Sequence, residues 1–234
     1  MTTPASLTST TVPEQSPPAY CVDEDILVRC TGDYATLCPA WQVMASGSDG
    51  SFSSGTPWVL SSATVNFANN GVNPGMVVQL TKQSVFPGIG RFCAIDSIST
   101  NTVTLRLPHK DLNVGQPPGV GGVTGVNFVI ATMDQQIEEA SFELKRRYGI
   151  DESIPYRASS WVFDERDLRM ATVLTVLKDR YISESRTRQG DFEEKIRRIE
   201  QELVKVLDRV QIRWGPFGNS AEPSTLFSCQ IARG

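Results

Sequence analysis

The strongest periodic pattern in the chain lies in residues 191–210, DFEEKIRRIEQELVKVLDRV. Apolar residues recur there every three or four positions, and charged residues occupy the other side. This spacing is typical of an amphipathic helix that packs one stripe against a core. We expect the helix to begin at Gly190-Asp191, with Glu194 at the capping-box position. The stripe consists of Phe192, Ile196, Ile199, Leu203, Val206, Leu207 and Val210.

Helical patterns also precede this stretch. Thr132 and Gln135 have the spacing of a capping box, and Gly149 is suited to end the helix that follows. A further helix is expected from Asp164 to about Ser185. A short one is expected over Asp23–Arg29, because its three acidic residues suit the positive end of a helix dipole. The same acidic residues could bind a metal ion, but pairing with the dipole is the commoner role.

Residues 40–131 have a different pattern, with alternation of apolar and polar residues and many turn signals. Such a segment is typical of a small barrel or sandwich. The expected strands include Val77–Leu80, Phe92–Ile98, Val103–Leu107 and Val126–Ile130. The expected turns are Ser48-Asp49-Gly50, Asn69-Asn70-Gly71, Asn73-Pro74-Gly75 and Pro87-Gly88. Aromatic residues of this part are expected to pack in the core rather than stack on bases, because few Lys or Arg accompany them.

Together these patterns predict an α+β fold: a helical bundle of three long helices plus a short N-terminal one, with an inserted small β-barrel or sandwich and an extended C-terminal tail. The predicted organisation is a flexible arm over 1–19, the bundle over 20–39 and 132–213, the β insertion over 40–131 and the tail over 214–234. Charge is distributed in the same way, since residues 138–213 hold 16 Lys or Arg and 16 Asp or Glu.

Composition argues against several classes of function. The formal net charge of −4 disfavours general nucleic-acid binding by the whole surface. The chain has one histidine, His109, and its five cysteines lack metal-ligand spacing, so we predict free thiols, no cofactor, no metal and no enzymatic activity. No apolar run is long enough to cross a membrane, and no signal peptide is visible, so we expect no membrane partner.

Two groups of residues are candidate binding sites. Basic runs occur in two of the expected helices, and they could contact a neighbouring subunit or line a channel for DNA: Lys145, Arg146, Arg147, Arg197 and Arg198. Acidic residues are interleaved with these basic residues in both helices, so the alternative is an ordinary charged helix face in contact with solvent. In the tail, Trp214–Gly218 is expected to form a turn and Pro223–Ile231 an apolar extended segment, which is unusual for a free chain end. The candidate docking residues there are Phe217, Leu226, Phe227, Ile231 and Arg233.

Several short motifs resemble the head–tail connector (adaptor) proteins of tailed bacteriophages. These proteins contain a run A-S-x-E-(I/L)-x-x-x-Y, which is matched here by Ala140, Ser141, Glu143, Leu144 and Tyr148. Their opening v-D-E-D-(I/L) is similar to Val22–Ile26. Similar motifs also occur at Leu177–Tyr181 and Asp191–Lys195. The resemblance covers roughly residues 20–32 and 132–213. The β segment departs from it, because simpler members of the family have a short connection there.

The resemblance implies a structural virion protein at the head–tail junction, made in the host bacterial cytoplasm. Members of this family form a ring, usually of about twelve copies, below the portal. The ring extends the channel for genomic DNA, without sequence recognition, and is a platform for a downstream tail protein such as a nozzle or tail terminator. The C-terminal segment would attach to the portal protein. The alternative is an oligomeric binding module whose β domain recognises a glycan or a host protein.

Overall fold

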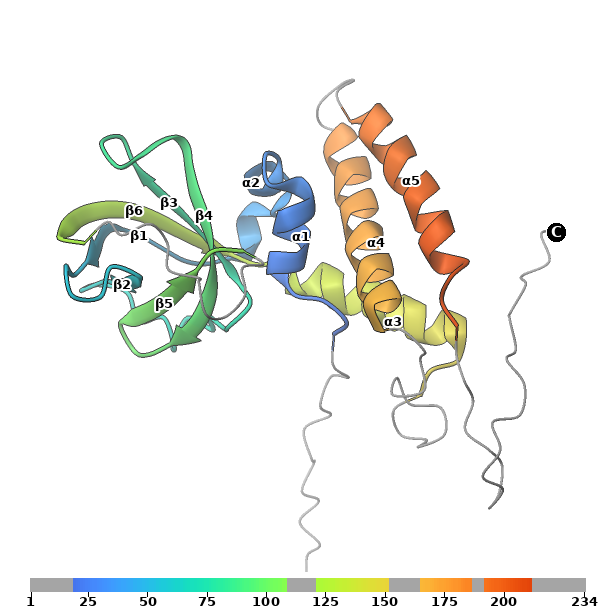
Figure 1. The fold of residues 1–234 in the computed structure, drawn as a ribbon, viewed down its shortest axis with the longest axis horizontal. Helices are drawn as coiled ribbons and strands as arrows, with labels where there is room; N and C mark the ends of the chain where they lie inside the picture. Colours follow the sequence, from blue (N-terminus) through green and yellow to red (C-terminus); the bar gives the residue numbers. More distant parts are fainter. Residues whose placement is uncertain (1–18, 109–120, 152–164, 187–191, 212–234) are drawn as a thin grey trace, which may run out of the picture.

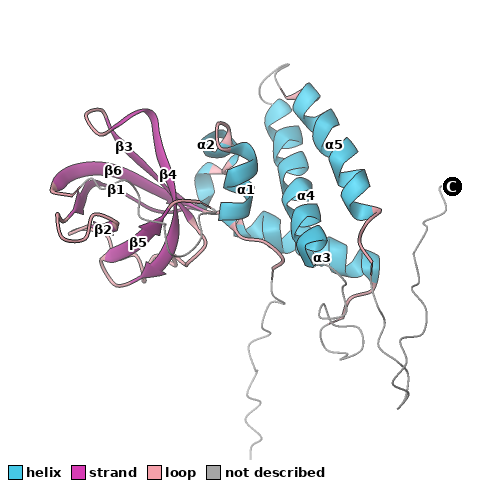
Figure 2. Cartoon of the chain, viewed as in Figure 1, coloured by secondary structure: helices cyan, strands magenta, loops and turns pink. Residues whose placement is uncertain are grey.

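The computed structural model describes residues 19–108, 121–151, 165–186 and 192–211. A β-barrel lies at one side of the molecule and three long helices at the other, with two short helices between them (Figure 1). Figure 2 shows the same separation of strands from helices. Within the described residues, no helix combines the length and the apolar character needed to cross a membrane.

Six strands form the barrel, and each pairs with its neighbours in antiparallel fashion. The order β1-β2-β5-β4-β3-β6 closes because β6 also pairs with β1. Closure leaves no unpaired edge along the sheet. The strands are β1 (Val43–Phe52), β2 (Val59–Ser61), β3 (Val77–Lys82), β4 (Phe86–Ile98), β5 (Thr102–Arg106) and β6 (Val123–Ala131).

The barrel interior is a single apolar cluster. Alternating residues point inward, as the two-residue period of a strand requires. In β6, for example, Val126, Phe128 and Ile130 are buried while Asn127 and Val129 are exposed. Phe67, outside the strands, is fully buried and packs against Phe128 with ring centroids 5.6 Å apart. The strand predictions at β3, β5 and β6 are confirmed, with shifts of one to three residues at their ends. The strand predicted at Phe92–Ile98 is also found, but β4 begins at Phe86, so the turn predicted at Pro87-Gly88 is wrong.

The predicted turn at Ser48-Asp49-Gly50 is wrong, because these residues lie inside β1. Gly50 and the preceding Gly47 are required there by packing. A Cβ atom on Gly47 would lie 2.7 Å from Cζ of Phe128, and one on Gly50 would lie 2.7 Å from the carbonyl oxygen of Val126. Glycine therefore allows the Phe128 ring and strand β6 to approach β1 closely, a role that local sequence does not distinguish from a turn.

Five α-helices are found in the described residues: α1 (Asp23–Cys30), α2 (Tyr34–Leu37), α3 (Asp134–Tyr148), α4 (Glu165–Ser185) and α5 (Glu193–Leu207). α4 and α5 lie side by side, and α3 packs across α4 (Figure 1). Gly149 ends α3 in the left-handed conformation, at φ 64°, as its position predicts. The helix predictions are confirmed to within about three residues at the ends that the structure describes.

The predicted fold class is wrong. The barrel is a closed six-stranded unit with a large core of its own, rather than a small insertion in a helical bundle. α1 has only eight residues, and it lies between the barrel and α4 instead of completing a four-helix bundle. The buried apolar cluster that contains the α1 residues Ile26 and Leu27 also includes Val77 of β3, and Phe92 of β4 packs against it. The short helices therefore bury apolar surface of the barrel as well as of the long helices.

The predicted capping box at the start of α3 is also wrong. The N-cap residue is Met133, and no side chain caps the helix from that position. The hydroxyl of Thr132 donates a hydrogen bond to Asp23 and accepts one from the backbone N–H of Asp134.

The prediction of free thiols is confirmed for four of the five cysteines, Cys21, Cys30, Cys38 and Cys93. The predicted N-terminal arm, apart from its last residue, and the whole of the predicted tail lie outside the described residues.

Candidate partner-binding surfaces

The first turn of α1 joins the barrel to the long helices. Asp23 is buried, and its carboxylate accepts hydrogen bonds from the Thr132 hydroxyl at 2.7 Å and from the Met133 N–H at 2.6 Å. Both donors belong to the connection between β6 and α3. Burial raises the pKa of Asp23 to about 7, although these two hydrogen bonds act in the opposite direction.

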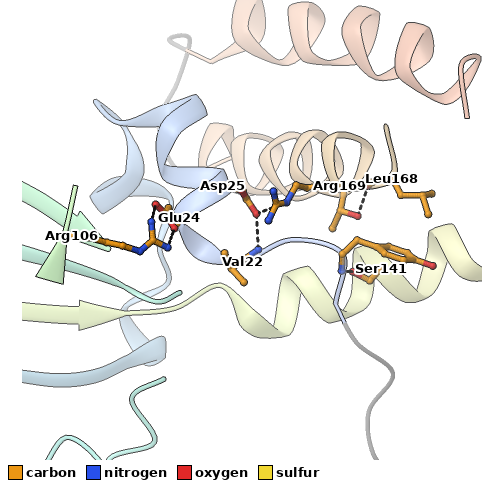
Figure 3. Close-up of polar contacts among 9 residues, drawn as sticks. Val22, Glu24, Asp25, Arg106, Ser141, Leu168 and Arg169 are labelled. Atoms are coloured by element: carbon orange, nitrogen blue, oxygen red, sulfur yellow. Dashed lines mark hydrogen bonds and ion pairs between the residues drawn. The ribbon is translucent and has the colours of Figure 1, made fainter. Parts of the chain in front are cut away.

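The next two acidic residues contact other parts of the chain (Figure 3). The Arg106 guanidinium of β5 donates to both carboxylate oxygens of Glu24. The Asp25 carboxylate accepts from the Val22 N–H at 3.0 Å and lies 3.1 Å from Nε of Arg169 on α4. α1 therefore binds the barrel through Glu24 and the long helices through Asp25, while Asp23 holds the connection between them.

The strand register explains how Arg106 reaches Glu24. Val43, Ala131, Val77, Ala94 and Arg106 form one cross-strand row that runs from β1 to β5. Val77 in this row is buried in the cluster formed with α1 and α2. Arg106 ends the row beside the start of α1. The outer face of the barrel at this end is therefore an interface within the molecule.

A second set of polar contacts joins α2 to α4 and α5. The Asp33 carboxylate accepts from Tyr181 of α4 at 2.6 Å and from Lys195 of α5 at 2.5 Å. Partial burial opposes ionisation, but these two donors lower the pKa of Asp33 below its usual range. Arg180 of α4 is buried and donates to the Leu37 carbonyl at 2.7 Å. The helices therefore have a fixed arrangement around α1 and α2.

The predicted basic residues lie in different environments. Lys145 is buried, with its ammonium 5.2 Å from the centroid of the Tyr20 ring. Arg146 and Arg147 are exposed at the end of α3. Arg197 is exposed on α5 and pairs with Glu194 at 2.6 Å, while Arg198 beside it is also exposed. Lys145 thus lies in the interior of the fold, and the four arginines lie at the surface.

A groove of about 310 Å³ lies where α3, α4 and α5 meet. Arg146 and Arg147 line it together with Lys178 of α4, and Glu143 is the acidic residue of the lining. Apolar residues, including Leu144 and Leu203, form the rest. The groove is therefore positively charged around an apolar floor, a combination that suits acidic protein side chains.

A second groove lies on the outer face of the barrel beside α2. Its volume is about 170 Å³, and the lining is mostly apolar, with Phe92, Val43 and Val129 from three strands. Trp41, two residues before Val43, is 77% exposed, and Val43 and Val129 are 40% and 38% exposed. Trp41 is one of the aromatic residues that sequence analysis expected in the core, because few Lys or Arg accompany them. The structure instead places it at the surface.

Other predicted site residues lie outside the described part of the chain. These are the candidate docking residues in the tail: Phe217, Leu226, Phe227, Ile231 and Arg233. Within the described ranges, no three His, Cys, Asp or Glu side chains are grouped so that they could hold a metal ion. Burial raises the pKa values of Cys30, Cys38 and Cys93 to about 12, which keeps these thiols protonated near neutral pH.

No protein-family model, curated protein or solved structure matches the chain.

Proposed function

We propose that the chain is a head–tail adaptor of a tailed bacteriophage, which forms a ring below the portal and extends the channel for genomic DNA. The ring would also present a docking platform to the next tail protein. The subunit would act by shape and contact, with no chemical step. In this proposal the protein is a component of the virion at the head–tail junction.

The observation that carries the proposal is the structural role of the residues shared with adaptor proteins. Ala140 and Leu144 are buried on the side of α3 that faces the other helices. The Ser141 hydroxyl accepts a hydrogen bond from the Tyr20 N–H at 3.2 Å, and Tyr148 donates to the Leu207 carbonyl at 3.0 Å. Four of the five motif residues therefore set the position of α3, while Glu143 is exposed, and these four contacts support a shared helical arrangement.

The first turn of α1, Asp23–Asp25, forms a joint between the barrel and the long helices, and this joint also supports a mechanical role. Asp23, Glu24 and Asp25 tie the barrel to α3 and α4 through buried or partly buried polar contacts. A platform must keep its shape when other components bind to it. The barrel would then be a second contact surface held at a constant angle to the ring.

Portal binding tests the proposal directly. The full chain is mixed with the portal protein encoded by the same genome, and the complexes are examined by mass photometry and negative-stain electron microscopy. We expect rings attached to portal, and immunogold label at the single head–tail vertex of virions. A chain that neither binds portal nor occurs in virions would refute the adaptor function.

Deleting residues 217–234 examines the role of the tail. We expect the truncated chain to keep its melting temperature and to lose attachment to portal, because the candidate docking residues lie in the deleted segment and would become ordered on assembly. A matched control deletes residues 2–15, which are polar and precede α1. Portal attachment by the truncated chain at the level of the full chain would contradict this role.

A second candidate function, recognition of a host protein or glycan by the barrel, is favoured by one observation. Trp41 lies 77% exposed close to the apolar groove beside α2. Exposed aromatic rings are frequent in binding sites for proteins and sugars. Glycan-array binding that is lost on Trp41→Ala, in a chain that does not bind portal, would establish this function instead.

A further inference from the structure

The outer face of α3 carries a self-complementary pattern, with an acidic residue toward one end of the helix, a basic residue toward the other and an aromatic residue between them. Glu138, Phe142 and Arg146 are spaced four residues apart, so they form one stripe along the helix. All three are exposed, and Phe142 is exposed to 61% although it is a large apolar residue. The stripe lies opposite Ala140 and Leu144, which face the core. The helix therefore presents an acid, an aromatic ring and a base at equal intervals.

We propose that two copies of this chain associate through α3, with the helices antiparallel and Phe142 at the two-fold axis. Glu138 of each copy then faces Arg146 of the other, and the two Phe142 rings pack together. A two-fold interface uses the same surface on both subunits, so it requires this kind of self-complementary pattern. The proposal is independent of the adaptor function, since it concerns the free protein.

The electrostatic environment favours a second copy over other occupants. The first half of α3 carries Asp134, Glu138 and Glu139 at the surface. The second half carries Arg146, Arg147 and one acidic residue, Glu143, at the groove that Lys178 of α4 also lines, so it is basic in balance. Antiparallel association brings the acidic half of each copy to the basic half of the other. A nucleic acid along the same face would meet the acidic half and be repelled.

The charged groups of the stripe are available for such contacts. Within the described residues, neither Glu138 nor Arg146 forms a hydrogen bond or an ion pair with another side chain. Glu139, by contrast, accepts from Gln135 at 3.2 Å, and Arg197 of α5 pairs with Glu194. Arginine and carboxylate groups can form two parallel hydrogen bonds when they meet. Each dimer would contain two such contacts around an apolar centre.

The interface is small, so the expected association is weak. One pair of packed helices buries less than the roughly 1,200–2,000 Å² that is usual for stable complexes. We therefore expect dissociation constants of micromolar to millimolar size, and weaker association at high salt. Sedimentation equilibrium of the full chain at increasing concentration should show a rise in mass from one chain to two. A chain that stays monomeric at about 1 mM, or grows beyond two copies, overturns the proposal.

Charge reversal gives the sharper test. Glu138→Arg or Arg146→Glu places two pairs of like charges across the interface, so each variant should dimerise at least ~10-fold more weakly. An equimolar mixture of the two variants should form a heterodimer, because every contact then joins opposite charges. Lys205→Glu on α5 is the matched control, with the same charge change at an exposed site, and should dimerise like the unmodified chain.

Two results would overturn the proposal. One is dimerisation of Arg146→Glu at unchanged strength, and the other is failure of the mixture to restore it. Binding of a short DNA duplex that is lost in Arg146→Glu, without any dimer, would assign the stripe to nucleic acid instead. Portal binding is scored in a separate experiment, so failure of the dimer and failure of the adaptor function are distinguishable.

Discussion

The interior of the barrel and the joint around α1 are both buried, but they are held together by different interactions. The barrel interior is apolar, and closure of the sheet satisfies the backbone groups of its strands. The joint contains three buried acidic residues that each have a polar partner. The barrel can therefore tolerate changes that preserve volume, whereas the joint requires particular charged groups.

The largest effect is expected in the barrel interior. Phe128→Ala removes a buried ring that packs against Gly47 and Gly50, and should lower the free energy of unfolding by about 3–5 kcal/mol. Urea unfolding followed by circular dichroism measures the change. Val129→Ala, at the next position on the outer face, is the control and should cost less than ~1 kcal/mol. Equal effects of the two substitutions would contradict the inward orientation of Phe128.

The core of the long helices should be slightly less sensitive. Leu203→Asp places a carboxylate on the buried stripe of α5, at a cost of about 3 kcal/mol or more. The neighbouring Val204 is 46% exposed, so Val204→Asp should change stability by less than ~0.5 kcal/mol. Thermal unfolding of both variants provides the comparison. An unchanged melting temperature for Leu203→Asp would mean that α5 does not bury this face.

The joint is tested by neutralising one buried charge. Glu24→Gln leaves the Arg106 guanidinium without a charged partner at α1, and should cost about 2–3 kcal/mol. Glu202→Gln breaks the Arg29 ion pair, in which both side chains are about 40% exposed, and should cost less than ~1 kcal/mol. Denaturant titration compares the two. If both variants behaved alike, burial of Glu24 would have no energetic consequence.

The smallest expected effect is a dependence of stability on pH at the joint. The pKa of Asp23 is raised from 3.8 to about 7, so the folded state holds the proton more tightly than the unfolded state. Its contribution is therefore fully present below pH ~4 and is lost as the pH rises through 7. Between pH 6 and pH 8 the loss should be roughly 1 kcal/mol, and Asp23→Asn should abolish it.

Asp33 provides the opposite case. Its pKa is lowered, so its contribution is present above the ordinary value of 3.8 and is lost as the pH falls further. The two residues therefore act in separate pH ranges. A stability curve that rises between pH 6 and pH 8 would contradict the assignment for Asp23 without bearing on Asp33.

Local patterns in the sequence were sufficient to predict most elements. The stripe through Leu203 and Val206 predicted α5, and alternation around Val126–Ile130 predicted β6. These predictions depend only on the period of side chains in helices and strands. The same reasoning took Gly50 for a turn residue, because the reason for this glycine is the close approach of Val126 and Phe128 in β6, which are distant in sequence.

Contacts between distant residues account for what sequence reasoning missed. Glu24 and Arg106 are 82 positions apart, and no spacing rule associates them. The acidic turn of α1 was correctly expected at a helix start, yet its main role is to bind three separate parts of the fold. The fold class was wrong for the same reason, since closure of the barrel depends on β1 pairing with β6.

The three consecutive acidic residues of α1 have a mechanical consequence. Because they follow one another on a helix, their side chains point in three directions, toward β5, toward the end of β6 and toward α4. A link at three divergent points resists twisting as well as bending. A force applied to the far rim of the barrel would thus be transmitted as torque to the long helices instead of being absorbed at a hinge.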